Sequence, residues 1–131
     1  MPTYSEDILR LAEANVIPLV TGEPRFELAN RLCGDRITIG ADIRHGCVHE
    51  IHWQIEGCAI LKASAAHLAR TLRGNSLAEG LENISAFMRS FEAGGVGSPQ
   101  GPMAAVYSLP ARYKCALLPW QACENFLRER L

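Results

Sequence analysis

The chain has 131 residues, of which 48% are hydrophobic and 21% are charged, and its formal net charge is −1. This length and composition predict one globular domain over residues 1–131 and exclude a disordered chain or a collagen-like repeat. The near-neutral charge indicates neither a nucleic-acid partner nor a basic surface for membranes.

The first predicted element is a helix over Ser5–Ala14. Ser5 is a suitable N-cap, and acidic residues follow it in the first turn. The expected apolar face of this helix consists of Ile8, Leu9, Leu11 and Ala12.

Alternating apolar residues next predict a β-hairpin. Its strands are Arg36–Ile43 and Val48–Ile55, with His45-Gly46 as the turn between them. The residues expected on one face of each strand are Ile37, Ile39, Ala41 and Ile43 in the first, and Ile51, Trp53 and Ile55 in the second. Phe26–Leu32 offers a third strand.

The second half of the chain reads as helices. The segment Cys58–Arg73 is rich in Ala and Leu, and we expect most of its surface to be buried apart from one stripe of Lys62, Arg70 and Arg73. A capping box of Ser76 and Glu79 opens a helix that runs to about Met88. After a flexible loop over Ala93–Pro102, the tail Ala111–Leu131 is mostly helical, with Pro119 limiting where its regular part begins.

This order of elements contains no strand–helix–strand alternation. It predicts an α+β fold in which helices cover one face of a small antiparallel sheet. The start of the chain shows no basic-then-apolar signal region, and no run approaches the roughly 18 apolar residues of a membrane span. We therefore expect a cytoplasmic protein with no membrane partner.

The cysteine content needs a separate explanation. The chain has five cysteines, an odd number, and no Cys-x-x-Cys pair: Cys33, Cys47, Cys58, Cys115 and Cys123. In a reducing cytosol such residues are metal ligands, reactive thiols or small buried apolar groups rather than disulfides.

Three of these cysteines fall at the ends of predicted elements. Cys33 precedes the hairpin, Cys58 joins the second strand to a helix, and Cys115 lies near the start of the last helix. A helix N-terminus is expected to lower the thiol pKa of Cys58 and Cys115. Asp35 lies two residues from Cys33 and, in an extended segment, points the same way. Three thiolates and a carboxylate make a four-ligand set for zinc or for one edge of an iron–sulfur cluster.

The remaining cysteines, histidines and tryptophans have simpler interpretations. His49 and His52 point to opposite faces of one strand, and no His-Glu-x-x-His motif occurs, so His45, His49, His52 and His67 are interpreted as surface or core residues. Cys47 and Cys123 are interpreted as structural, and Trp53 and Trp120 as packing residues.

Three segments together resemble a known family. They are Asn30–Arg36 (NRLCGDR), Glu56–Ala65 (EGCAILKASA) and Pro110–Leu117 (PARYKCAL). In this order they resemble the cysteine blocks of the iron–sulfur assembly scaffolds, which comprise IscU, SufU and the N-terminal domain of NifU. The resemblance implies a NifU N-terminal/SufE-like α+β fold and a site for zinc and/or a [2Fe–2S] cluster on Cys33, Asp35, Cys58 and Cys115.

The resemblance also implies a function and partners. The protein would be a non-catalytic scaffold that accepts sulfur from a pyridoxal-phosphate-dependent cysteine desulfurase and passes a cluster to apo iron–sulfur proteins or carriers. A second hypothesis is a zinc-dependent sulfur-transfer partner, sulfurtransferase-like in character, in which Cys33 accepts the persulfide. A third is a zinc-stabilised structural homologue without sulfur chemistry.

The third block separates the branches of the family. IscU-type proteins carry a histidine directly before the third cysteine, whereas this chain has Lys114. The resemblance is therefore greatest to the SufU-like branch, in which Lys114 and Arg112 would lie beside the site. Lys114 is expected to favour the Cys115 thiolate and to pair with Asp35 when no metal is bound.

Overall fold

The computed structural model describes residues 6–12, 24–30, 34–92 and 103–130. Its centre is a three-stranded antiparallel sheet in the order β1-β2-β3, with β1 at Phe26–Asn30, β2 at Asp35–Arg44 and β3 at Cys47–Glu56. The predicted hairpin and third strand are both present, and the last residues of the third-strand prediction lie outside the described residues.

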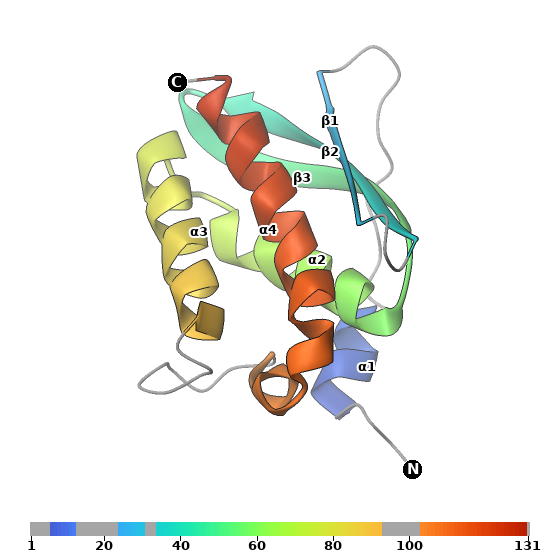
Figure 1. Cartoon of the computed structure of the whole chain (residues 1–131). Helices are drawn as coiled ribbons and strands as arrows, with labels where there is room; N and C mark the ends of the chain where they lie inside the picture. Colours follow the sequence, from blue (N-terminus) through green and yellow to red (C-terminus); the bar gives the residue numbers. More distant parts are fainter. Residues whose placement is uncertain (1–5, 13–23, 31–33, 93–102, 131) are drawn as a thin grey trace.

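Four helices accompany the sheet. They are α1 (Glu6–Ala12), α2 (Ala59–Leu72), α3 (Leu77–Glu92) and α4 (Tyr113–Arg128), with short 3-10 turns η1 (Ala104–Ser108) and η2 (Pro110–Arg112) before α4. In Figure 1, α2 and α4 cross one face of the sheet, α3 lies along α4, and α1 lies near the first turns of α2 and α4. The predicted α+β class is confirmed. No helix in the described part of the chain is both long and apolar enough to cross a membrane.

The hairpin turn has the geometry that its sequence predicts. His45 and Gly46 both have positive φ, at 54° and 75°. Two consecutive positive φ values are typical of a type I′ turn, whose twist matches that of the adjoining strands. Glycine adopts this conformation without the steric penalty that a side chain adds.

A β-bulge explains the burial pattern of β3. Asp42 pairs with Glu50 but Ile43 pairs with Val48, so His49 is the extra residue. A bulge shifts the inward-facing positions by one residue. Val48 and Ile51 are therefore both buried although they are three residues apart.

Helix α2 is the centre of the core, as its composition predicts. Lys62, Arg70 and Arg73 are exposed, and most of the other α2 side chains are buried. The one polar side chain buried in α2 is Ser64, whose hydroxyl donates to the Ala116 carbonyl and accepts a hydrogen bond of 2.9 Å from Trp120 Nε1. Ser64 thus links α2 to α4 next to Cys115.

Helix α3 begins as predicted and ends later. The Ser76 backbone N–H donates to Glu79 Oε1 at 2.9 Å, and the Glu79 N–H donates to Ser76 Oγ at 3.1 Å, which completes the capping box. The helix continues beyond Met88 to Glu92, and this added turn buries Phe91 against the rings of Tyr107 and Tyr113.

Two details of the helix predictions were wrong. In α1, Ile8 is buried but Leu9 is 46% exposed, because successive helical residues point about 100° apart. In α4, the regular helix begins at Tyr113 and contains Pro119. An internal proline costs about 3 kcal/mol and deprives the carbonyl of Cys115, four residues earlier, of its helical donor. Burial of Leu118, Pro119 and Trp120 in the core offsets this cost.

Candidate metal centre

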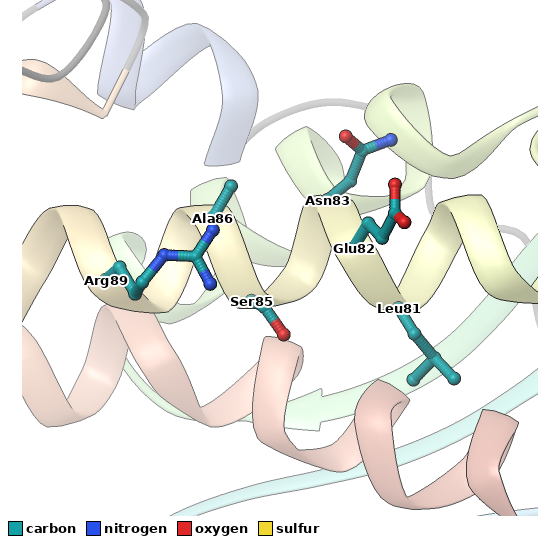
Figure 2. A pocket seen from close by; sticks show the side chains of 6 residues that line it. All are labelled: Leu81, Glu82, Asn83, Ser85, Ala86 and Arg89. Carbon is teal, nitrogen blue, oxygen red and sulfur yellow. The ribbon is translucent and has the colours of Figure 1, made fainter.

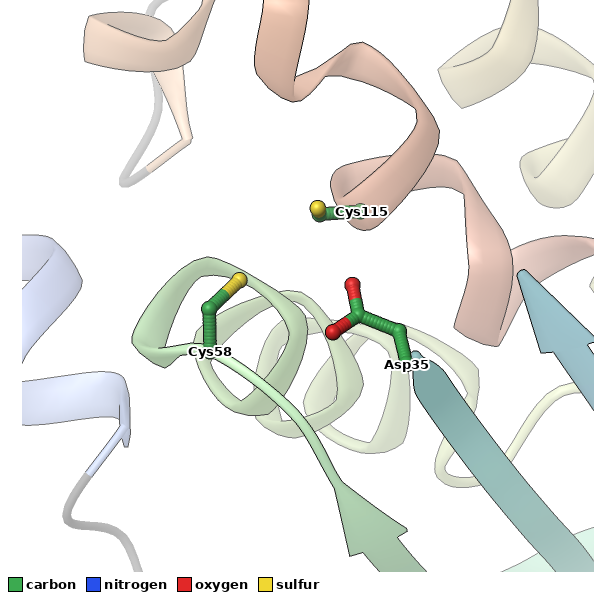
Figure 3. A group of neighbouring side chains, drawn as sticks. All are labelled: Asp35, Cys58 and Cys115. Atoms are coloured by element: carbon green, nitrogen blue, oxygen red, sulfur yellow. The ribbon is translucent and has the colours of Figure 1, made fainter. Parts of the chain in front are cut away.

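Three of the predicted ligand residues converge on one point. Asp35, Cys58 and Cys115 each offer a ligand atom, and these atoms all lie within 4.8 Å of one another. Figure 3 shows the Asp35 carboxylate and the two sulfur atoms pointing toward the same space from three separate elements.

The positions of these side chains follow from where their elements begin. Asp35 is the first residue of β2, and Cys58 is the N-cap of α2, with extended backbone at φ −79° and ψ 171°. Cys115 lies in the first turn of α4, where the neighbouring Ala116 carbonyl accepts from Ser64 in α2. This contact ties the first turn of α4 to the helix that follows Cys58.

Two of the three side chains are buried, Cys58 is half-buried, and one oxygen of the Asp35 carboxylate has no hydrogen-bond partner. Asp35 is 5% exposed and Cys115 is 3% exposed. Among the described residues, Asp35 Oδ2 is the buried side-chain oxygen or nitrogen that has no hydrogen-bond partner. A buried carboxylate oxygen without a partner is costly unless it is paired or coordinates a metal. Two sulfurs and this oxygen fit zinc or iron, which accept thiolate and carboxylate ligands.

The electrostatics of Cys115 differ from the prediction. Burial, together with the hydrogen bond and negative charge of Asp35 and the nearby Cys58, raises the pKa of the Cys115 thiol well above its usual range. The expected lowering at a helix N-terminus was therefore wrong for Cys115. Desolvation of a thiolate among other acidic groups outweighs the partial positive charge of the helix end.

The other predicted site residues are Cys33, Lys114 and Arg112. Cys33 lies outside the described residues. Lys114 and Arg112 are exposed at the start of α4. In the described part of the chain no ion pair joins Lys114 to Asp35, whose Oδ2 has no partner, so the expected pairing is absent from this structure.

The remaining cysteines lie apart from this group. Cys47 is half-buried at the start of β3, and Cys123 is buried in α4. Burial raises the pKa of Cys123 to about 12. Neither residue belongs to the group formed by Asp35, Cys58 and Cys115.

The histidines are distributed over the surface and the core. His45 and His49 are exposed, whereas His52 is buried. His67 packs against the rings of Phe87 and Trp120, at centroid distances of 5.9 and 5.6 Å. Its burial, followed by the charge of Arg70, lowers the pKa of His67. Trp53 and Trp120 are buried packing residues, as predicted.

A separate surface hollow lies on α3 and has no part in the site. It is lined by Leu81, Glu82, Asn83, Ser85, Ala86 and Arg89, all from this one helix, as Figure 2 shows. These side chains include no cysteine and converge on no common point.

Comparison with known proteins assigns the family. The family described as the NifU-like N terminal domain matches residues 17–106, more than half of the chain. The chain belongs to this family. The matched segment includes Cys33, Asp35 and Cys58, and Cys115 follows it.

Two relatives extend the comparison. The zinc-dependent sulfurtransferase SufU of Bacillus subtilis is 30% identical over 108 residues, which cover 76% of this chain and 71% of the relative. The iron–sulfur cluster assembly scaffold protein IscU of Thermotoga maritima is 29% identical over 134 residues, covering 96% of this chain and 93% of the relative.

Solved structures share the fold. A crystal structure of an iron–sulfur cluster assembly scaffold protein for the SUF system from Fervidobacterium islandicum matches with a TM-score of 0.77 and 24% identity, covering 95% of this chain and 96% of that one. The N-terminal part of a NifU-like protein from Brucella abortus matches with a TM-score of 0.77 and 23% identity, covering 95% and 92%. The predicted NifU-like fold is confirmed.

Proposed function

We propose that this protein is an iron–sulfur cluster assembly scaffold that accepts sulfur from a cysteine desulfurase. The observation that carries the proposal is the convergence of the buried Asp35 and Cys115 with the half-buried Cys58, in a chain of the NifU-like N-terminal family. Cys33 completes the ligand set in this proposal, since it lies two residues from Asp35 in the sequence. The [2Fe–2S] cluster is cargo, built on these residues and passed to apo iron–sulfur proteins or carriers.

Sulfur delivery requires a nucleophilic thiolate on this chain. In our proposal the Cys33 thiolate attacks the terminal sulfur of the persulfide carried by the desulfurase cysteine. A new S–S bond forms at Cys33, the S–S bond of the desulfurase breaks, and its cysteine leaves as a thiolate. The desulfurase, a pyridoxal-phosphate enzyme, generates the persulfide, so the transfer needs no further oxidant.

A second candidate function is zinc-dependent sulfur transfer. It is favoured by the similarity to the Bacillus subtilis SufU and by Lys114, which stands directly before Cys115. Zinc, when bound, would neutralise the thiolates and order the site. Lys114 and Arg112 would then attract the negatively charged persulfide, since both are exposed beside Cys115.

The proposed function also implies a domain organisation and a cellular location. We infer that residues 1–131 act as one scaffold domain in the cytoplasm, where thiols stay reduced and the partners are other proteins of a sulfur relay. Nucleic acid and membranes have no role in this proposal.

Stimulation of a cysteine desulfurase by the purified protein tests the proposed function. We expect Cys33→Ala to abolish the stimulation while the circular dichroism spectrum is retained and zinc still binds with lower affinity, because Cys33 transfers the sulfur and three other ligands remain. Cys47→Ala is the matched control and should keep full stimulation. A protein that binds zinc but never stimulates a desulfurase would instead be a zinc-stabilised structural homologue.

Reconstitution then separates the two candidate functions. Under strict anaerobiosis with iron and sulfide, a scaffold assembles a visible cluster that moves to an apo-ferredoxin. A zinc-dependent sulfur-transfer protein shows stimulation but no transferable cluster.

Asp35→Ala is expected to slow the loss of the bound metal or cluster. Oxygen is the hardest donor of the set and binds soft metals less tightly than sulfur does, so it is the donor that an incoming ligand displaces first. We expect release to a chelator to slow by about tenfold, comparable in size to, and opposite in direction from, the effect of mutating the groups that support metal ligands. Faster release from the variant would contradict this role for Asp35.

A further inference from the structure

Gly57 lies directly opposite Asp35 at the end of the β2–β3 ladder. The last pair of the ladder joins Arg36 to Glu56, so Asp35 and Gly57 are the next residues on their two strands. Gly57 is also the last residue before Cys58. It therefore lies between two of the three converging ligand residues.

The space at Gly57 is occupied by the Asp35 carboxylate. An added Cβ would lie 2.7 Å from Asp35 Oδ1 and 3.1 Å from Asp35 Cγ. It would also lie 2.5 Å from Leu61 Cδ2. Real Cβ atoms essentially never approach other atoms below 3.0 Å, so a side chain at position 57 forces a neighbour to move.

Backbone conformation does not explain this glycine. In the described part of the chain, the glycines with positive φ are Gly34, Gly46 and Gly74, and a Cβ on any of them would meet nothing within 4 Å. Gly57 shows the opposite combination, with an ordinary φ and severe crowding. The close contacts with Asp35 and Leu61, rather than the backbone conformation, are what favour glycine at position 57.

Of the two crowded neighbours, the carboxylate yields more readily. Leu61 is fully buried within α2 and is confined by the core. Asp35 Oδ2 has no hydrogen-bond partner, so the hydrogen bond that a rotating carboxylate gives up is the one with Cys115.

We propose that Gly57 is a positioning residue that allows the Asp35 carboxylate to face Cys58 and Cys115. The proposal rests on the proposed function only in that the occupant of this site is a metal ion or cluster. Any side chain at position 57 turns the carboxylate away from the two sulfurs. Gly57→Ala should therefore reproduce the consequences of Asp35→Ala at the metal centre.

A double-mutant cycle between positions 57 and 35 tests this proposal. Four proteins are compared: wild type, Gly57→Ala, Asp35→Ala and the double variant. They are loaded with zinc to measure release to a chelator, and with cobalt(II), whose visible absorption reports the ligand set. We expect Gly57→Ala to slow zinc release by about tenfold, as for Asp35→Ala, comparable in size to, and opposite in direction from, the effect of mutating the groups that support metal ligands. The double variant should match Asp35→Ala in both rate and spectrum.

Gly80→Ala is the matched glycine control. Gly80 lies in α3, where an added Cβ would come no closer than 3.4 Å to Leu127 Cδ1. This variant should release zinc as the wild type does. A wild-type release rate and a wild-type cobalt spectrum for Gly57→Ala would overturn the proposal. A further change in zinc release when Gly57→Ala is added to Asp35→Ala would also overturn it, because the effect would then act through Leu61 and Cys58.

Unfolding of the metal-free proteins provides a readout that does not depend on metal binding. We expect Gly57→Ala to lower the urea midpoint less in the Asp35→Ala protein than in the wild type, because one of the two close contacts is then absent. If Gly57→Ala lowers the urea midpoint equally in the wild-type and Asp35→Ala proteins, the proposed contact is wrong. It is also wrong if neither Gly57→Ala nor the double variant folds. A wild type that binds neither zinc nor cobalt contradicts the proposed function, while this unfolding cycle still decides the role of Gly57.

Discussion

Cys115→Ser is expected to lower the zinc affinity of the protein by at least about 100-fold, since altering groups that only orient metal ligands already has effects of about 10- to 100-fold. Serine is nearly isosteric with cysteine, but its hydroxyl does not ionise at neutral pH and replaces a soft sulfur donor with a weak oxygen donor. Competition with a chromophoric zinc chelator measures the change in affinity, and cluster reconstitution should fail in parallel.

Cys47→Ser is the matched control for this prediction. Cys47 is half-buried at the start of β3 and lies outside the group of converging ligands. Its replacement should leave zinc affinity and reconstitution unchanged. If Cys115→Ser retains wild-type affinity and a native circular dichroism spectrum, Cys115 is not a ligand and the proposed site is wrong.

Trp120→Ala is expected to lower the free energy of unfolding by about 3–5 kcal/mol, the range for truncating a large buried aromatic residue. Trp120 is 1% exposed, and its ring stacks on Phe87 with a centroid distance of 3.8 Å and an interplanar angle of 5°. Its indole N–H also donates to Ser64. The truncation therefore removes core volume, the stacking contact and the hydrogen bond that ties α4 to α2. Urea unfolding followed by circular dichroism measures the loss.

Trp120→Phe separates the contribution of the ring from that of the hydrogen bond. Phenylalanine keeps most of the stacked surface but lacks the N–H, so we expect a smaller loss, with about 1 kcal/mol attributable to the hydrogen bond. Equal losses in the two variants would show that packing against Phe87 contributes little.

The elements with local signals were predicted well. Alternation of apolar residues located β2 and β3, His45-Gly46 located their turn, and Ser76 with Glu79 located the start of α3. Each of these signals depends on residues close together in the sequence, so no knowledge of the tertiary structure is needed to interpret them.

The incorrect predictions share a different cause. Pro119 was expected to delimit a helix, yet it lies inside α4, because burial of its neighbours outweighs the lost hydrogen bond. The Cys115 pKa was expected to fall near a helix end, yet burial beside Asp35 raises it. In both cases a long-range packing effect exceeds the local preference.

Two contributors to the site were missed. Ser64 stands as a polar residue in the apolar segment Ala63–Ala66, and this contrast was the available signal for a buried hydrogen-bonding role. Gly57 gave no comparable signal, because its importance depends on the side chain of Asp35 across the ladder. A single sequence does not reveal such a contact.

The sequence by itself determined the types of element and predicted the donor types of the site, from three cysteines at expected element ends, an aspartate two residues from the first of them, and the cysteine blocks of a scaffold family. The tertiary structure decided which of these side chains lie close together and how far each is buried from solvent. It brings ligand atoms from β2, the start of α2 and the start of α4 within 4.8 Å of one another and buries Asp35 and Cys115 almost completely. The physical reason is that periodicity and capping act over a few residues, whereas desolvation and ligand geometry arise only when distant segments pack together.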